Sequence, residues 1–193
     1  SNDLCSLNPN EEKLAQGLEM IVDSQGKVIE SEIFETVIKT KKRLTYNKCN
    51  EVLETKDCKS DKEYLDVLPD LEIMNELALI LQQKNTKRGA LDFDVPEGKI
   101  IVDEEGKAID VKLIKRGVSE RIIESFMILA NETVAETIER MDLPFIYRVH
   151  DKPDPIKLQD LKVLSQALGY SLRAGYSTEI QKFLTSIKEE DDF

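Results

Sequence analysis

The hydrophobic and polar pattern of the chain is longest and most regular between Ser119 and Arg140, which predicts a helix over these residues. The first half of this run, SERIIESFMILA, is apolar nearly all round, and such a helix is normally buried. Ser119 is expected to cap its first turn, because a serine oxygen accepts from a backbone N–H that has no partner inside the helix. At about 100° per residue, four polar residues fall on one narrow stripe: Glu120, Arg121, Glu124 and Asn131.

The polar stripe has two interpretations. A carboxylate on a buried helix needs a partner, and a bound ligand can be that partner. Alternatively, the stripe faces water or a neighbouring lysine, and spacing alone favours this second interpretation.

Two hairpins are predicted from alternating apolar residues. Leu18, Met20 and Val22 alternate on a first strand, a turn follows at 23–26, and a second strand runs over 27–38. Another hairpin is predicted from the strands 99–102 and 107–114. Its sequence IVDEEGKAID echoes IVDSQGKVIE in the first hairpin, but shared turn chemistry explains the likeness without an internal repeat.

The remaining pattern alternates further helices with short apolar or polar runs. Helices are predicted from Thr45 to about Leu53, from Pro69 to about Lys84, from Pro155 to Gly169, and from Ser177 onward. Residues 57–66 are predicted to form a polar loop, and strands are predicted over 90–95 and, buried, over 143–150. No boundary divides the chain, so the prediction is one mixed α/β (α+β) unit, with β-hairpins and a mainly antiparallel sheet packed with helices.

Composition sets the class of protein. The 193 residues are 40% hydrophobic and 34% charged, which is a soluble globular composition, and no apolar run is long enough to cross a bilayer. No signal peptide is expected at the start. Cys5, Cys49 and Cys58 are odd in number and fit no zinc or redox spacing, which indicates a reducing compartment and an expected cytoplasmic location. The net charge of −11 means that any RNA contact must be local.

Few residues offer catalytic chemistry by themselves. His150 is the only histidine, which disfavours a histidine-based zinc site and a Ser-His-Asp triad. Asp92 and Asp94 share one face of a predicted strand and could bind Mg2+ through oxygen, although a solvated strand face is favoured. Phe93 lies on the opposite face with apolar neighbours, which indicates a core position first and an aromatic platform for bases second.

Five ordered motifs together resemble the catalytic (RNB) domain of the ribonuclease II and ribonuclease R family. They are LCSLNP at 4–9, TYNKCNEVL at 45–53, KRGALDFD at 87–94, ERIIESFMILANETVA at 120–135 and LPFIYRVHDKP at 143–153. The resemblance is strongest over 3–169. The bacterial ribonuclease R branch is the closer match, since the RGALDFD and LPFIYRVH runs are of its type.

The resemblance implies a processive 3′→5′ exoribonuclease that hydrolyses single-stranded RNA to nucleoside monophosphates with Mg2+. In that family the metal-binding aspartate cluster precedes LCSLNP, and a Ser-Pro-Ile-Arg-Arg motif follows the region matched here. Residues 1–193 are therefore expected to be a central part of one catalytic domain, with no metal ligand and no complete catalytic site, and to be inactive alone. The alternative is a non-catalytic RNA-binding or scaffold module of the same fold.

Three family positions fall within the chain. Tyr46 and Glu124 match the tyrosine and glutamate that the family uses near the 3′-terminal ribose to favour RNA over DNA. A carboxylate can accept a hydrogen bond from the 2′-OH, which only RNA presents. Phe93 matches the aromatic residue that stacks on bases near the 3′ end, and such stacking is worth roughly 1–3 kcal/mol per base.

Two basic runs could guide phosphates. Lys42 and Arg43 lie in KTKKRLTYNK and Arg88 lies in a second basic stretch, but a solvated face explains such runs equally well. The expected partner is the 3′ end of single-stranded RNA, with no membrane and no preference for DNA. A domain cut through its sheet would expose strand edges and could self-associate.

Overall fold

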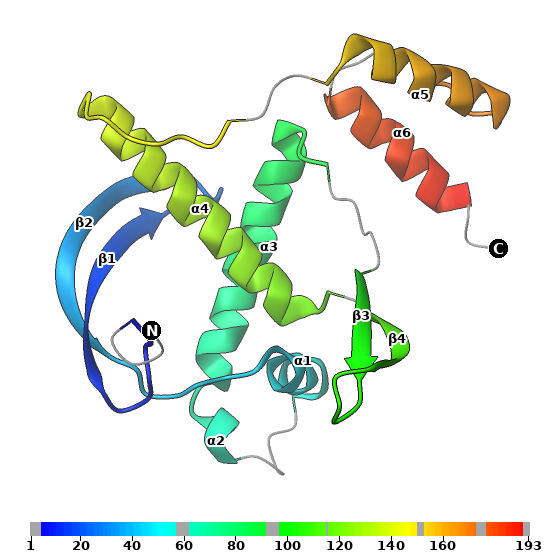
Figure 1. Ribbon diagram of the computed structural model, residues 1–193. Helices are drawn as coiled ribbons and strands as arrows, with labels where there is room; N and C mark the ends of the chain where they lie inside the picture. Colours follow the sequence, from blue (N-terminus) through cyan, green and yellow to red (C-terminus); the bar gives the residue numbers. More distant parts are fainter. Residues whose placement is uncertain are drawn as a thin grey trace. The chain divides into compact units, whose positions relative to one another are not determined.

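The computed structural model describes residues 5–56, 62–91, 97–114, 116–149, 153–172 and 177–190 (Figure 1). In chain order the elements are β1 (Glu12–Val22), β2 (Val28–Lys39), α1 (Tyr46–Thr55), α2 (Lys62–Leu65), α3 (Leu68–Arg88), β3 (Glu97–Val102), β4 (Ala108–Ile114), α4 (Val118–Arg140), α5 (Pro155–Ala167) and α6 (Ser177–Glu190). Strands and helices thus occur in one chain, and the predicted mixed α/β fold class is confirmed.

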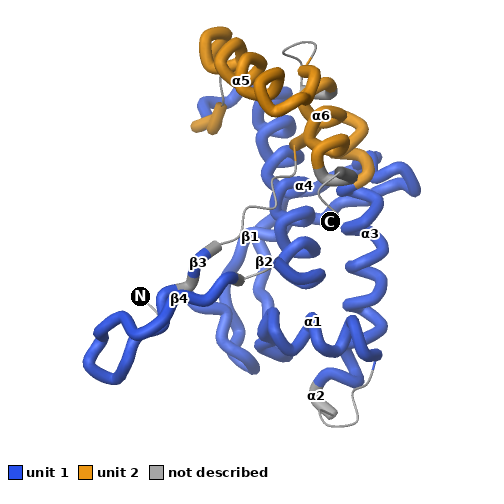
Figure 2. The backbone as a smooth tube through the Cα atoms, turned by 90° about the vertical axis from the view of Figure 1, so that its right-hand side faces the viewer, with its two compact units in different colours: residues 1–82, 96–145 blue, residues 83–95, 146–193 orange. Residues whose placement is uncertain are grey.

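The chain forms two compact units, coloured separately in Figure 2. The first comprises residues 1–82 and 96–145, and the second comprises residues 83–95 and 146–193. Helix α3 begins in the first unit and ends in the second. The single RNB-type domain expected over 1–193 stays a prediction.

The first hairpin pairs β1 with β2 in antiparallel register, from Glu12 opposite Lys39 to Val22 opposite Val28. Its turn is built around Asp23, whose Oδ1 accepts from the backbone N–H groups of the second and fourth residues that follow, at 2.8 and 2.9 Å. The turn ends at Gly26, whose φ of 76° is a conformation that glycine adopts without a steric cost.

The second hairpin repeats this turn chemistry. Asp103 Oδ1 accepts from the backbone N–H groups of Glu105 and Lys107 at 3.0 and 2.8 Å, and Gly106 has a φ of 81°. Each hairpin also has a register shift just before its turn, where two residues face one across the ladder. The likeness between the two sequences therefore has the local cause that was predicted.

The core of the first unit lies where α1, α2 and α3 meet, and its buried members are Cys49, Val52, Tyr64 and Leu71. Helix α4 adds Ile122 and Leu129, which are also buried. In Figure 1, α4 crosses α3, and Gln82 Nε2 donates to Ser125 Oγ at 3.4 Å between these two helices.

Helix α3 runs four residues beyond its predicted end, to Arg88. Lys87 and Arg88 therefore lie in its last turn, where positive charge suits the negative end of the helix dipole. The apolar run at the start of α4 is also less buried than predicted. Met127 is 58% exposed, because only one side of the helix faces the core.

Two sequence-based predictions of loops and strands are wrong. The polar stretch 57–66 contains the short helix α2, because Tyr64 is buried in the core and its hydroxyl accepts from the backbone N–H of Thr45 at 3.4 Å. Residues 143–149 form no strand, and Ile146 is 94% exposed. Each sheet among the described residues has two strands, and neither includes this segment, so its apolar pattern has no ladder to join.

The second unit contains the helices α5 and α6 and the end of α3. Its core consists of Leu172, Ile180 and Phe183. The rings of Tyr170 and Phe183 pack edge to face, with their centroids 6.2 Å apart. Gln181 Nε2 donates to the carbonyl oxygens of Thr86 and Ala90, both at 3.1 Å.

The predicted start of α5 at Pro155 and the glycine predicted to close it are confirmed, and the helix itself ends at Ala167. Asp154 caps its first turn by accepting from the backbone N–H of Ile156 at 2.8 Å, and Pro155 is the first helical residue. Gly169 follows the helix with a φ of 88°. In the part of the chain that the structure describes, none of the helices combines the length and the hydrophobicity needed to cross a bilayer.

Candidate nucleic-acid interface

The start of α4 is tied to α1 by one asparagine side chain. Asn50 Oδ1 accepts from the backbone N–H of Ser119 at 2.8 Å, and Asn50 Nδ2 donates to Glu120 Oε2 at 2.9 Å. These two partners fix the orientation of the amide, because its acceptor must face an N–H and its donor must face a carboxylate. The Ser119 hydroxyl lies 3.1 Å from the Tyr46 carbonyl oxygen, to which it can donate, and 2.8 Å from Asn50 Oδ1.

Helix α4 is capped differently from the prediction. Gly117, not Ser119, occupies the N-cap position, and Glu120 Oε2 reaches back to accept from the Gly117 N–H at 3.0 Å. Ser119 lies inside the first turn, so the N-cap role predicted for it is wrong. Its unpaired N–H is satisfied by Asn50, which is 69 residues away in the sequence.

Gly117 is required by space rather than by conformation. Its φ of −87° and ψ of −171° are open to any residue. However, a Cβ atom added there would lie 2.5 Å from Cγ and 2.6 Å from Oδ1 of Asn50. The absence of a side chain at 117 therefore lets the amide approach the first turn of α4.

The network changes the titration of two side chains. Burial raises the pKa of Glu120, but hydrogen bonds from Asn50, from its own backbone, from Ser119 and from Gly117 outweigh burial, so the pKa is lowered overall. For Cys49, burial raises the pKa of the thiol, and the nearby Glu120 carboxylate raises it further. Cys49 is thus a buried apolar side chain rather than a reactive thiolate.

Tyr46 combines a fixed backbone with an open side chain. It is the first residue of α1, its carbonyl oxygen accepts from Ser119, and the residue is 49% exposed. Thr45 occupies the predicted N-cap position in extended conformation, although its side chain makes no capping hydrogen bond.

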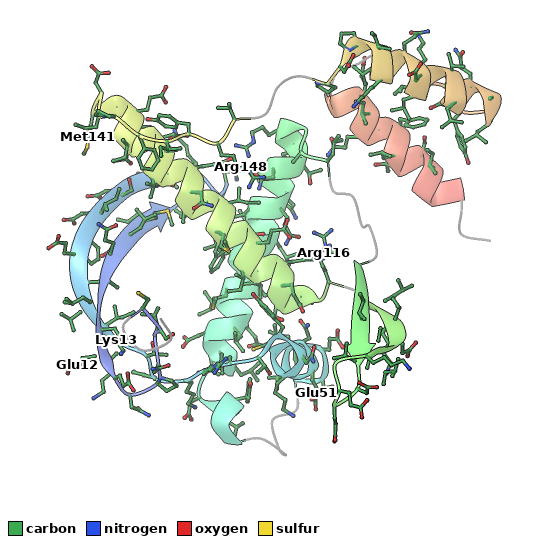
Figure 3. The ribbon with its side chains drawn as sticks, viewed as in Figure 1. Glu12, Lys13, Glu51, Arg116, Met141 and Arg148 are labelled. Atoms are coloured by element: carbon green, nitrogen blue, oxygen red, sulfur yellow. The ribbon has the colours of Figure 1, made fainter. Side chains whose placement is uncertain are left out.

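Glu124 lies one turn after Glu120 on α4, so the Cβ atoms of these two residues are about 5–6 Å apart. Its side chain is 51% exposed, and its Oε2 accepts from Arg116 Nη1 at 3.3 Å. Figure 3 labels Arg116, which lies just before α4. An ion pair this exposed contributes only about 0–1 kcal/mol. The carboxylate can therefore exchange this contact for a ligand hydroxyl at small cost. The two stripe carboxylates thus have an amide and an arginine as partners, not lysines.

The predicted phosphate-guiding residues fall in different places. Lys42 and Arg43 precede α1, and Lys42 Nζ pairs with Asp66 Oδ2 at 3.2 Å. Arg88 lies in the second unit, where its Nη2 donates to Asn85 Oδ1 at 3.1 Å. Phe93 lies outside the described residues.

Asp92, Asp94 and His150 also lie outside the described residues. Among the residues that are described, no group of three or more His, Cys, Asp or Glu side chains is placed to hold a metal ion. The described residues therefore do not fit the Mg2+ that the family resemblance implies.

Sequence reasoning missed Asn50, Arg116 and Gly117. Asn50 carried a weak signal, because asparagine is a poor residue for a helix interior and needs a local reason to be there. Arg116 and Gly117 carried none, since their partners come from α4 and α1.

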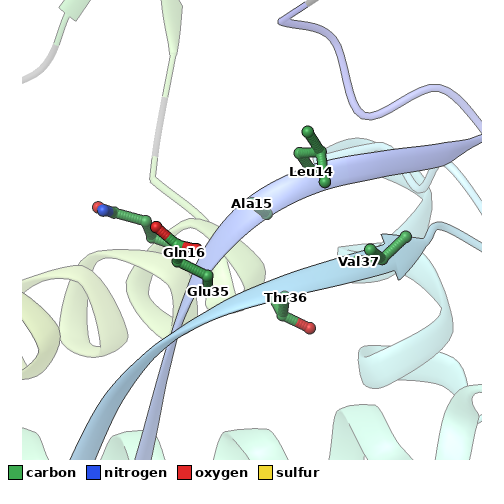
Figure 4. A pocket seen from close by; sticks show the side chains of 6 residues that line it. All are labelled: Leu14, Ala15, Gln16, Glu35, Thr36 and Val37. Carbon is green, nitrogen blue, oxygen red and sulfur yellow. The ribbon is translucent and has the colours of Figure 1, made fainter.

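A shallow pocket between β1 and β2 contains none of the candidate residues (Figure 4). Three cross-strand pairs line it: Leu14 with Val37, Ala15 with Thr36, and Gln16 with Glu35. Leu14 is almost fully exposed, so the pocket is a concave strand surface rather than an enclosed site.

Two β-hairpins and several helices define a mixed α/β fold, in which the half-exposed Tyr46 is hydrogen-bonded through its backbone to the helix that carries Glu124. The sequence profile described as the RNB domain matches residues 1–193, and the chain belongs to this family.

Ribonuclease R of Thermotoga maritima is 44% identical to this chain. The match covers 98% of this chain and 27% of the Thermotoga protein. Mycoplasma genitalium RNase R in complex with ribose-methylated single-stranded RNA has a TM-score of 0.88 at 30% identity, covering 99% of this chain and 30% of that one. The same protein in complex with double-stranded RNA has a TM-score of 0.86, also at 30% identity, covering 100% of this chain and 34% of that one. The chain thus spans about a quarter of the curated relative and about a third of the solved structures.

Proposed function

We propose that this chain forms the part of a 3′→5′ exoribonuclease catalytic domain that holds the 3′ end of single-stranded RNA. The enzyme would hydrolyse RNA processively to nucleoside monophosphates. The observation that carries the proposal is the RNB match over residues 1–193, supported by the TM-score of 0.88 to an RNase R bound to single-stranded RNA.

Glu124 would recognise the 2′-OH of the terminal ribose. Its carboxylate is half-exposed and is held by one exposed arginine contact, so it is available to accept a hydrogen bond from a hydroxyl. Tyr46 would lie beside the same ribose, since its backbone is bonded to the first turn of the helix that carries Glu124.

Phosphate binding would be spread over Lys42, Arg43 and Arg88. This assignment rests on the exposed or partly exposed positions of Lys42 and Arg43 between β2 and α1 and of Arg88 at the end of α3. It also rests on the need for local positive charge in a chain of net charge −11. The resulting affinity should fall as salt rises, because phosphate contacts release counterions.

Phe93 would stack on a base near the 3′ end, a role that rests on the family resemblance alone. Phe93→Ala should weaken binding of short RNA ends. A fall in thermal stability with unchanged binding would instead make Phe93 a core residue.

Mg2+ would be held by family aspartates that precede the LCSLNP motif in sequence. On this basis we propose that residues 1–193 alone bind RNA without cleaving it, and that a longer protein carrying them does both. The proposed location is the cytoplasm, which the odd number of cysteines favours.

The test uses 5′-labelled single-stranded RNA, Mg2+ and two proteins: residues 1–193 and the complete protein in which they occur. Products are read on a denaturing gel and binding on a native gel. The expected result is a ladder shortening from the 3′ end with the complete protein, and a shifted but intact band with residues 1–193.

Two other results would change the proposal. A complete protein that binds RNA and never shortens it would favour the non-catalytic RNA-binding or scaffold module. A ladder with residues 1–193, free of contaminating nuclease, would make Asp92, Asp94 and Glu124 the metal candidates.

A further inference from the structure

The contacts between α1 and the first turn of α4 do more than hold two helices together. The Asn50 side chain is hydrogen-bonded to Ser119 and Glu120, and Ser119 is hydrogen-bonded to the Tyr46 carbonyl oxygen. Gly117 leaves room for the amide. We infer that Asn50 is a positioning residue that fixes the Tyr46 side chain relative to Glu124 and thereby sets the preference for RNA over DNA. This inference rests on the proposed function.

The geometry fixes the rotation of α1. Tyr46 and Asn50 are four residues apart, so they lie one above the other on the same face of the helix. Both are attached to Ser119 of α4, one through a backbone carbonyl and the other through a side-chain amide. Two attachments one turn apart prevent α1 from turning about its axis, and the direction of the Tyr46 side chain follows from that rotation.

Hydrogen bonds restrict the rotation of α1 about its axis more closely than apolar packing would. Apolar contacts between helices tolerate small rotations, whereas hydrogen bonds weaken steeply away from linear geometry. Ser119 is 5% exposed, so water has little access to its side of the contact. The Asn50 amide accepts from the Ser119 N–H through its oxygen and donates to the Glu120 carboxylate through its nitrogen.

The contact also fixes the position of Glu124. Glu120 and Glu124 lie on successive turns of one rigid helix. The hydrogen bond between Asn50 and Glu120 therefore also fixes the position of Glu124 relative to α1. The two groups proposed to lie beside the ribose therefore keep a constant separation. Losing the contact should reduce discrimination at the 2′-OH more than it reduces total affinity, because phosphate contacts supply most of the affinity.

The test replaces the side-chain amide of Asn50. Asn50→Asp keeps the size of the side chain and its acceptor for Ser119, but it sets a carboxylate against Glu120. The double variant Asn50→Asp with Glu120→Gln restores one donor facing one acceptor, with their order reversed. Asn47→Asp is the matched control, because it makes the same change at an exposed position of the same helix.

The measurement is the dissociation constant for a single-stranded RNA and for the same RNA ending in one 2′-deoxynucleotide, with each variant of the 193-residue chain. The ratio of the two constants reports 2′-OH discrimination. We expect Asn50→Asp to reduce this ratio about tenfold, which is the value of one hydrogen bond to a charged group. The double variant should return it to within about twofold of the original chain, and Asn47→Asp should leave it unchanged.

The outcomes separate this inference from the proposed function. A preference for the RNA end in the original chain that Asn50→Asp leaves intact, even with weaker binding to both ends, would overturn the inference and spare the proposed function. No preference in the original chain would remove the proposed roles of Tyr46 and Glu124 and the inference with them. If Asn50→Asp does not fold, the folded double variant decides: a ratio like that of the original chain supports the inference, and a lowered ratio overturns it.

Discussion

Gly117→Ala is the substitution that most directly probes the contact between α1 and α4. It adds one methyl group at a position whose backbone conformation suits alanine, so backbone strain does not enter. The methyl group would overlap the Asn50 amide, which must then move away. The Asn50 hydrogen bonds to Ser119 and Glu120 depend on the present position of that amide.

The expected loss of stability follows from those two bonds. The bond to the Glu120 carboxylate is worth about 1.5–3 kcal/mol and the bond from the Ser119 N–H about 1 kcal/mol. Asn50 and Glu120 are partly exposed, so water can replace part of the lost hydrogen bonding, and the lower end of the range given for the Glu120 bond applies. Alanine returns about 0.4–1 kcal/mol by restricting the unfolded chain. The net loss in the free energy of unfolding should be about 2 kcal/mol.

Urea unfolding followed by far-UV circular dichroism measures this loss, because the chain has no tryptophan to report it by fluorescence. The slope of the unfolding free energy against urea should stay constant, so that the midpoint carries the change. Gly98→Ala is the control: its Cβ atom would meet only the side chain of the exposed Val111, at 3.3 Å. It should cost much less than Gly117→Ala.

The refuting result comes from a double-mutant cycle. In an Asn50→Ala background the amide is gone, so Gly117→Ala should cost nothing or stabilise slightly. If Gly117→Ala costs about 2 kcal/mol with or without the Asn50 side chain, the overlap with the amide is not its cause.

Three further results are expected. The folded chain lowers the pKa of Glu120 below its ordinary value of 4.5, so the stability that this carboxylate contributes is complete above that pH and is lost as the pH falls through the lower folded pKa. Glu120→Gln should therefore flatten the fall of the urea midpoint below about pH 4.5, and an unchanged pH profile would contradict this account. Ile122→Ala, at a 2% exposed residue, should cost about 2–5 kcal/mol of unfolding free energy, whereas Ile123→Ala, at a 36% exposed neighbour, should cost clearly less; equal losses in urea unfolding would refute the assigned burial. Glu124→Ala should relax the preference for RNA over DNA ends in competition binding, and unchanged discrimination would exclude the role proposed for it.

The two hairpin turns show what local sequence could predict. Asp23 accepts from backbone groups within four residues, and Gly26 supplies the left-handed conformation that the turn needs. All the partners lie in one short segment, so the pattern of residues contained the whole interaction. The same holds for Asp154 and Pro155 at the start of α5.

The segment 143–149 shows the opposite case. Its apolar run predicts a buried strand, but a strand needs a neighbour to complete its hydrogen bonds, and no strand among the described residues pairs with it. Around Tyr64, tertiary contacts add an element that the sequence does not predict. The core formed by α1 and α3 buries the Tyr64 ring, and a short helix forms where the polar sequence indicates a loop.

The candidate site divides in the same way. The sequence by itself determined the helix that carries Glu124, the helix that begins at Tyr46, and the family to which both positions belong, because periodicity and ordered motifs are properties of the chain. Only the tertiary structure decided that Gly117 caps α4, that Asn50 satisfies the Ser119 N–H, and that Arg116 faces Glu124. The Asn50 contact joins residues 69 positions apart, and its geometry exists only after α1 and α4 have packed.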